Sequence, residues 1–438
     1  MVTPELTMQV NTLWTAFMTA RVSPLDTLEQ ITRALADRSY RPSQNATPEL
    51  RTALIDLLDS APMQNSTVQT EVYDHLVAKL AISAQSGQSG PALTPNHIMK
   101  LMVDLVEPTP DDTIIDPTVG TGGMLVAVAA YVRNRRPGFS TDAGANHGSN
   151  GALLTGVAPN APLNRIATTN LRLHGVRNVA LSNGDPLGEE TGVGNTGHGT
   201  FSIVLANSPF AGTRDSVAAA KDLLTVVRTK KTELLFLAHS LRLLRDGGRA
   251  AIILPDSALF GTSKAHTDAR RTLVEDHKLD AVVRLPAGVF RPHSALSTSI
   301  LLFHKAKTTD SVWFYDVRAD GFTLDDNRAQ IEADDLPDVV ERWRSLRSLR
   351  NMAATEAGDG TEKTAHETVR PRTSQSFVVP RSEIAEQGYD LTFNRYRIVL
   401  GERVVHRSAN DILIDIARLE LRIQQGSSAL ARALAETL

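Results

Sequence analysis

Apolar residues between positions 1 and 85 recur at steps of three and four, which is the period of an α-helix with one buried face. Two such series are Leu13, Phe17 and Ala20, and then Leu28, Ile31 and Leu35. Glycine is absent before Gly87, which is typical of a run of helices. We therefore predict an N-terminal helical domain over residues 1–88, with a linker at 84–91.

The pattern changes after Pro95. An amphipathic helix is indicated at 97–107, a short apolar strand at 113–117 and a second helix at 124–132, with a glycine cluster between the strand and that helix. A strand, a glycine-rich turn and a helix in this order form the first unit of a doubly wound α/β sheet.

Similar units follow along the chain. Short β-rich runs stand at 178–185, 201–210, 249–260, 279–290 and 298–305. Stretches with helical period at 230–245 and 264–277 separate some of them, and the polar, glycine-rich segment 133–151 is typical of a loop. We predict an α/β core with a Rossmann-like sheet over residues 89–330.

The C-terminal part is expected to differ from this core. We predict an extension over 331–400, in which 351–375 is poor in bulky apolar residues and is expected to be flexible. A helix that docks on a partner is predicted over 401–438. Its narrow apolar seam consists of Ile412, Ile416, Leu419, Ile423, Leu430 and Leu434.

Composition narrows the possible functions. The chain has 438 residues, no cysteine and a net charge of -3, from 46 Lys+Arg against 49 Asp+Glu. Cysteine-based metal sites, thiol nucleophiles and disulfides are thereby excluded. No apolar run reaches the ~20 residues of a membrane span, and we expect a cytoplasmic protein with no membrane association. The near-neutral charge indicates that any binding to nucleic acid uses a local patch or a partner subunit.

The first candidate site is the turn that follows the strand at 113–117. An acidic residue at the strand tip can hold a cation or a hydroxyl group, and glycines let a ligand approach the backbone. The turn consists of Asp116, Pro117, Thr118, Val119, Gly120, Thr121, Gly122 and Gly123. Leu125 stands where the dinucleotide-binding pattern requires glycine or alanine, so hydride transfer is disfavoured. The alternative is a tight structural turn.

The second candidate is Asn207-Ser208-Pro209-Phe210, at the end of the run 201–210. One interpretation is a turn that ends a strand, with Phe210 folded into the core. The other is a site for a flat ring that carries an amine. Phe210 would then stack on the ring, while the Asn207 side-chain oxygen and the Ser208 carbonyl accept hydrogen bonds from the amine.

These residues resemble the modification (M) subunits of type I restriction-modification systems, which are adenine-N6 DNA methyltransferases dependent on S-adenosylmethionine. The family's cofactor motif is similar to Asp116–Leu125, and its N-P-P-[FY] motif is similar to Asn207–Phe210. Segments 89–105 and 170–187 also resemble family segments, and the likeness runs from about residue 10 to 400.

The resemblance implies a seven-stranded Rossmann-like methyltransferase core that binds S-adenosylmethionine and needs no metal. Besides the turn residues, it implies cofactor contacts from Thr94, Pro95 and Asp185. Asn207, Ser208, Pro209 and Phe210 would act on an adenine extruded from double-stranded DNA. Two M chains are expected to assemble with a specificity subunit, and with a restriction subunit where one exists.

The chain departs from the family at two positions. Ser208 replaces a proline, but the backbone carbonyl that acts there is retained. Ala158 replaces the glutamate that holds the cofactor ribose, which implies binding weaker by about 10- to 100-fold unless Asn160 or the segment 133–151 substitutes. Two alternatives stay open: a degenerate subunit that binds without methylating, and an amine methyltransferase acting on proteins or small molecules.

Overall fold

The structure is a computed structural model that describes residues 3–36, 47–83, 93–135, 153–188, 199–210, 220–306, 309–354, 367–399, 413 and 417–427. The chain divides into two compact units, Met1–Arg397 and Ile398–Leu438. The predicted linker at 84–91 lies outside the described residues, as do 136–151 of the predicted loop and 355–366 of the segment expected to be flexible.

The N-terminal region is helical, as predicted. Its elements are α1 (Pro4–Thr19), α2 (Pro24–Ala36), α3 (Pro48–Asp59), a 3-10 turn (Ala61–Gln64) and α4 (Ser66–Ser83). Proline stands in the first turn of α1 and α3, where its missing N–H is harmless, and Thr3 and Thr47 cap these two helices. The predicted apolar series lie in one buried cluster, which also takes in Ile166 from outside this region.

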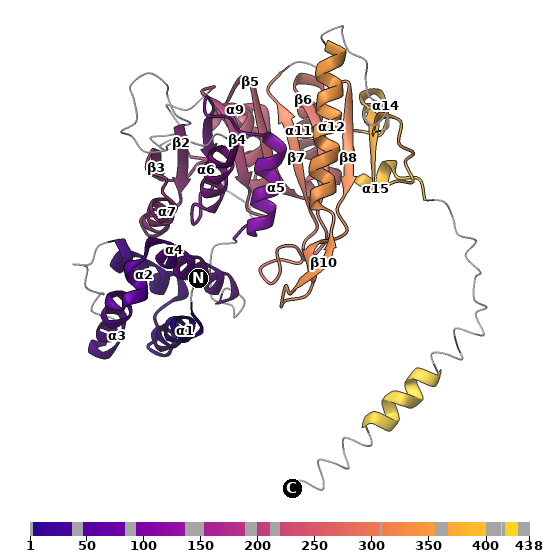
Figure 1. Ribbon diagram of the computed structural model, residues 1–438. Coiled ribbons are helices and arrows are strands. Elements are labelled where there is room, and N and C mark those ends of the chain that lie inside the picture. Colours follow the sequence, from indigo (N-terminus) through magenta and orange to yellow (C-terminus); the bar gives the residue numbers. More distant parts are fainter. Residues whose placement is uncertain are drawn as a thin grey trace. The chain divides into compact units, whose positions relative to one another are not determined.

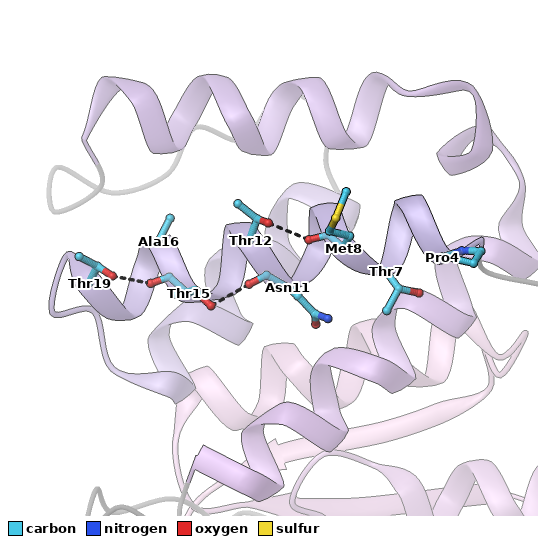
Figure 2. A pocket seen from close by; sticks show the side chains of 8 residues that line it. All are labelled: Pro4, Thr7, Met8, Asn11, Thr12, Thr15, Ala16 and Thr19. Carbon is cyan, nitrogen blue, oxygen red and sulfur yellow. Dashed lines mark hydrogen bonds between the residues drawn. The ribbon is translucent and has the colours of Figure 1, made fainter.

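One face of α1 forms a shallow hollow of about 690 Å³. Figure 2 shows the threonines along this face, which donate from their hydroxyls to backbone carbonyls one turn earlier. None of the lining residues belongs to a predicted site. The site considered below is built from other residues.

A nine-stranded sheet forms the centre of the first unit. Its strands are β1 (Thr113–Asp116), β2 (Leu153–Ala158), β3 (Val179–Asn183), β4 (Phe201–Asn207), β5 (Leu244–Pro255), β6 (Lys278–Arg284), β7 (Thr298–His304), β8 (Ser311–Asp316) and β11 (Ser376–Pro380). Their spatial order is β11-β8-β6-β7-β5-β4-β1-β2-β3. Only β7 and β11 run antiparallel to their neighbours. The α/β class is confirmed, but the expected seven strands are extended by β8 and β11.

Helices cover both faces of this sheet (Figure 1). On one face lie α5 (Asn96–Val106), α6 (Gly123–Arg135), α7 (Ala161–Leu173) and α12 (Leu336–Ala354), and on the other lie α8 (Lys221–Val226), α9 (Thr232–Leu243) and α11 (Lys264–Arg271). Alternate strand residues serve the two faces: Ile203 of β4 packs toward α5, and Val204 packs toward α9. Strands buried on both faces read as continuous apolar runs, which explains the sequence pattern.

Part of the predicted extension over 331–400 belongs to the sheet, because β11 pairs with β8. The remaining elements of this unit are a π-helical turn (Thr272–Asp276), α10 (Ser257–Phe260), α14 (Arg381–Glu386), α15 (Phe393–Tyr396) and a separate hairpin of β9 (Asp320–Phe322) and β10 (Gln330–Asp334).

In the second unit, residues 417–427 are helical, and Leu419 and Ile423 of the predicted seam are exposed there. The other four seam residues lie outside the described part of the chain. Among the described residues, no helix combines the length and the apolar character needed to cross a membrane.

Candidate functional site

The two candidate motifs lie at the same edge of the sheet. β1 and β4 are parallel neighbours, and they end at Asp116 and Asn207. Thr118 connects them: its hydroxyl lies 3.2 Å from Asp116 Oδ1 and 3.2 Å from the Asn207 carbonyl oxygen, and its backbone N–H donates to Asp116 Oδ1 at 2.9 Å. The carboxyl ends of parallel strands are where open α/β sheets bind ligands.

The glycine turn presses its backbone against α7. Gly122 has φ +84°, and a Cβ there would meet the backbone of Ala167 at 3.3 Å. Asn170, also on α7, donates from Nδ2 to the Thr121 carbonyl at 2.8 Å. Gly120 (φ +50°) faces much more open space. Glycine suits both positions because of the left-handed backbone, and at Gly122 also because of the close approach to Ala167.

Asp116 is a buried carboxyl with an altered proton affinity. Asp116 is only 4% exposed, and in the described part of the chain its side chain accepts two hydrogen bonds, both from Thr118. Burial raises the pKa of Asp116 to about 7, although the Thr118 hydrogen bonds act in the opposite direction. A buried carboxyl of this kind favours the approach of a cation, which would restore its ionised form.

The side-chain amide of Asn207 has a hydrogen-bond partner at its nitrogen but none among the described residues at its oxygen. Its Nδ2 donates to Thr94 Oγ1 at 2.8 Å, while its buried Oδ1 has no hydrogen-bond partner among the described residues. Buried polar atoms are normally paired, so an orphaned acceptor at a strand end indicates a site for a donor from a ligand. The structure thus brings Thr94 to Asn207.

Ser208 is held firmly although it is not a proline. Its Oγ donates to the Ile253 carbonyl at 2.6 Å, its backbone N–H approaches the same oxygen at 3.4 Å, and the residue is 2% exposed. The neighbouring strand β5 therefore fixes this backbone by hydrogen bonds where a proline ring would fix it by its own geometry.

The sequence left two interpretations of Phe210, a core residue or a ring that stacks on a ligand, and its environment has features of both. It is partly buried and packs on the hydrophobic core, and its ring contacts Phe290 edge-on with centroids 4.7 Å apart and an interplanar angle of 69°. Pro209 is exposed. Sequence reasoning assigned no role to Phe290, which is fully buried behind Phe210; a phenylalanine in the run 279–290 was the only signal.

The remaining predicted cofactor residues lie around β2, β3 and α5. Ala158 ends β2, is fully buried, and accepts from the Gly184 N–H at 2.9 Å. Asp185 follows β3, is exposed, and accepts from the Leu187 N–H at 3.0 Å. Asn160 uses its Oδ1 to cap α7, accepting from Leu163 N at 3.0 Å, so this oxygen is engaged in the helix.

Pro95 and Gly123 each stand where a helix starts. Pro95 is the N-cap of α5, and Gly123 is the first residue of α6. Pro117 and Thr118 follow the strand tip directly, so the predicted turn residues form one continuous segment.

A second hollow of about 280 Å³ opens at the carboxyl ends of β5 and β6. Asp256 there accepts from Ser299 Oγ at 2.7 Å, and burial raises the pKa of Asp256. Arg284 donates to Asp316 at 3.0 Å, and Phe260 presents an exposed ring. The sequence did not reveal this hollow, because its lining comes from separate parts of the chain.

Comparisons with known proteins agree on one family. The family model for N-6 DNA methylases matches residues 64–403. The EcoEI methylase subunit of the type I restriction enzyme from Escherichia coli is 30% identical over 260 residues, which are 59% of this chain and 51% of that protein. The chain spans about half the length of the curated relatives it matches.

Solved structures agree on the fold. A chain from a structure on complex assembly and conformational transition of the type I R-M system has a TM-score of 0.67 and 20% identity, covering 97% of this chain and 98% of that one. A Listeria monocytogenes structure described as a class I S-adenosylmethionine-dependent methyltransferase has a TM-score of 0.55 and 17% identity, covering 78% of this chain and 99% of that one. The fold is that of these methyltransferases.

Proposed function

The chain belongs to the N-6 DNA methylase family, and we propose that it methylates the N6 atom of adenine in double-stranded DNA, with S-adenosylmethionine as the methyl donor. The observation that carries this proposal is the Asn207 side chain. Its Nδ2 is engaged by Thr94 and its buried Oδ1 is unpartnered among the described residues, at the end of the strand that precedes Ser208 and Phe210.

The residues present suit an amine on an aromatic ring. The lone pair of adenine N6 is delocalised into the ring, which makes the amine a poor nucleophile. Asn207 Oδ1 and the Ser208 carbonyl oxygen are two acceptors that draw the amine hydrogens out of the ring plane and so localise the lone pair. Holding the amine in this orientation supplies much of the rate enhancement. No basic side chain is required for that.

An adenine must leave the duplex to reach this strand end, which costs a few kcal/mol of unstacking. Phe210 would recover part of that free energy by stacking on the base, and Phe290 holds the Phe210 ring from the side. The partly buried position of Phe210, in contact with the core, is compatible with this role.

The glycine turn and Asp116 suit the methyl donor. S-adenosylmethionine, when bound, supplies an electrophilic methyl group on a sulfonium. Asp116 is a buried carboxyl at a strand tip whose two hydrogen bonds come from Thr118, so it fits a ligand that carries a positive charge. Pro117, Thr118, Gly120, Thr121, Gly122 and Gly123 would hold the ligand through the turn, with Pro95 at the start of α5 and Asp185 beside the adenine ring.

Recognition of the DNA sequence would come from a partner. The net charge of -3 gives the chain no general attraction to DNA, and the curated relatives are described as methylase subunits of type I restriction enzymes. We propose a hetero-oligomer of two such chains with a specificity subunit, joined by a restriction subunit where one is encoded. Leu419 and Ile423 in the C-terminal helix offer apolar side chains for packing on the partner.

A second function is favoured by one observation. Ala158 provides no polar group at the end of β2, and the Oδ1 of Asn160 is occupied in capping α7. A subunit that retains the fold and its partners without binding the cofactor would show this arrangement. An amine methyltransferase for proteins or small molecules shares the Asn207 chemistry and differs in having no requirement for DNA.

Calorimetric titration with S-adenosylmethionine separates the first two functions. We would compare the natural chain with Ala158→Glu and with Ala158→Gln, which has the same size but no charge. Micromolar binding by the natural chain supports the methyltransferase. Binding by Ala158→Glu alone supports the degenerate subunit, and the binding must then be repeated in the complex with the specificity subunit. Methyl transfer to protein or small amines in the absence of DNA would support the third function.

A further inference from the structure

We propose that Thr94 is a positioning residue for Asn207, and that the β9–β10 hairpin keeps Thr94 in place through His97. This inference rests on the proposed function and refines it. The resemblance to the family suggests only that Thr94 contacts the cofactor. The structure shows a further contact, in which the Thr94 hydroxyl accepts a hydrogen bond from Asn207 Nδ2 at 2.8 Å.

In the structure, Thr94 takes the donor end of the Asn207 amide, which leaves the acceptor end toward the substrate. A carboxamide has a donor end and an acceptor end, and a rotation of the amide exchanges them. With Nδ2 bonded to Thr94 Oγ1, the acceptor Oδ1 is left for the adenine amine. The reversed amide would place a donor against the donors of the amine, and methyl transfer would lose one of its two acceptors.

Thr94 is joined to the start of α5. It precedes Pro95, whose carbonyl accepts from the N–H groups of Ile98 and Met99, both at 3.0 Å. A displacement of the first turn of α5 is therefore passed directly to the Thr94 hydroxyl. What holds this turn also holds the amide of Asn207.

A contact from far along the sequence holds that turn. His97 Nε2 lies 2.9 Å from Asp320 Oδ2 on β9, and the imidazole stacks on Phe322 with centroids 4.7 Å apart and an interplanar angle of 29°. The Asp320 side chain is fully buried and also pairs with Arg328. Although burial opposes ionisation, hydrogen bonds from His97 and Arg328 hold the pKa of Asp320 below its ordinary value.

Two residues of β9, Asp320 and Phe322, thus contact His97 in the first turn of α5, the helix that Thr94 precedes. The stacked ring restricts the tilt of the imidazole, and the carboxylate restricts its rotation. Two constraints of this kind fix a side chain more firmly than either does alone, which suits a residue that must keep a neighbouring segment in register. Figure 1 shows the hairpin projecting below the sheet near the lower end of α5.

The test compares Thr94→Val, which keeps the shape but removes the hydroxyl, with Thr94→Ser, which keeps the hydroxyl. The full chain in complex with its specificity subunit is assayed for single-turnover methyl transfer to DNA, and the Kd for S-adenosylmethionine is measured separately. We expect Thr94→Val to slow methyl transfer by about 5- to 150-fold at saturating cofactor, because a buried amide N–H loses its acceptor. The Kd should stay within about twofold, and Thr94→Ser should restore most of the rate.

The hairpin has its own variant and control. Asp320→Asn is also expected to slow methyl transfer, by a smaller factor than Thr94→Val, and again without a change in the cofactor Kd. The control is Asp326→Asn. Asp326 lies on the same hairpin and forms an exposed ion pair with Arg291, and its replacement should leave the rate unchanged.

Two results would overturn the inference. One is a raised cofactor Kd for Thr94→Val with an unchanged rate at saturation, which would make Thr94 a cofactor contact. The other comes from crystal structures of the natural chain and Thr94→Val: an Asn207 amide in the same position in both shows that Thr94 does not set it. The crystallographic comparison needs no activity. If the natural complex fails to methylate DNA, the proposed function fails while the positioning role is still decided.

Discussion

Replacing Asp116 by asparagine is expected to stabilise the cofactor-free protein at alkaline pH and to have little effect at acidic pH. The pKa of Asp116 is raised to about 7 by burial, against 3.8 for the same carboxyl in an unfolded chain. Between these values the folded protein binds more protons than the unfolded protein, so its free energy of unfolding falls as the pH rises through this window. Above the folded value the whole unfavourable contribution is present.

The raised pKa of Asp116 lowers the free energy of unfolding by at most about 4 kcal/mol, because each of the about 3 units between the two pKa values corresponds to 1.36 kcal/mol. Asparagine matches the protonated aspartic acid in size and removes the ionisation. The difference in Tm between Asp116→Asn and the natural chain should therefore be small near about pH 4, close to the unfolded pKa, and reach a few degrees near about pH 8.

Scanning calorimetry at both pH values measures this difference. Asp111→Asn is the matched control, because Asp111 is an exposed carboxyl in the loop that leads into the same strand. A difference in Tm that is equal at both pH values would refute the reasoning, since it would show that Asp116 does not change its ionisation within this range.

The same carboxyl couples cofactor binding to proton release. If Asp116 faces the positive charge of S-adenosylmethionine, binding lowers its pKa, and about half a proton should be released near about pH 7. Titrations in two buffers of different ionisation enthalpy measure the released protons. Asp116→Asn should release none, and equal release by both chains would assign the proton to another group.

Three further outcomes are expected. Ala158→Glu should tighten binding of S-adenosylmethionine by about 10- to 100-fold in calorimetric titrations, because it restores a charge-assisted hydrogen bond; an equal gain for Ala158→Gln would contradict this reason. Ser208→Ala should reduce stability by about 1 kcal/mol through loss of the hydrogen bond to Ile253, seen as a lower Tm, while the rate of methyl transfer changes by less than about twofold. Gly122→Ala should destabilise the protein by about 1–3 kcal/mol, because of its φ of +84° and its contact with Ala167 at 3.3 Å; an unchanged Tm would show that the turn can relax.

The sequence predicted local features better than contacts across the sheet. The helical periods placed the N-terminal helices, and the strand-turn-helix pattern placed β1, the glycine turn and α6. The hydrogen bond between Thr94 and Asn207 spans 113 residues, and neither residue alone indicates the other. Position along the chain also hides that β4 lies beside β1, and that β5 supplies the Ile253 carbonyl that holds Ser208.

The sequence analysis did not predict strands β8 and β11, for a similar reason. The apolar residues of β8 and β11 show no clear alternation, since strands such as β8 are buried on both faces. β11 pairs with β8 across the 59 residues of chain between Asp316 and Ser376, which include the segment expected to be flexible. Long-range pairing of this kind leaves no local pattern. Phe290 was likewise missed because its role depends on its contact with Phe210.

Asn207 is proposed to serve a site that methylates adenine in DNA. The most direct measurement is nucleoside mass spectrometry of DNA from a host without its own adenine methylation, in which the chain is co-expressed with its specificity subunit. We expect N6-methyldeoxyadenosine with the natural chain and none with Asn207→Ala, although both bind S-adenosylmethionine equally. Methylated adenine at the same level with Asn207→Ala, or none with a natural chain that binds the cofactor, would contradict this proposal.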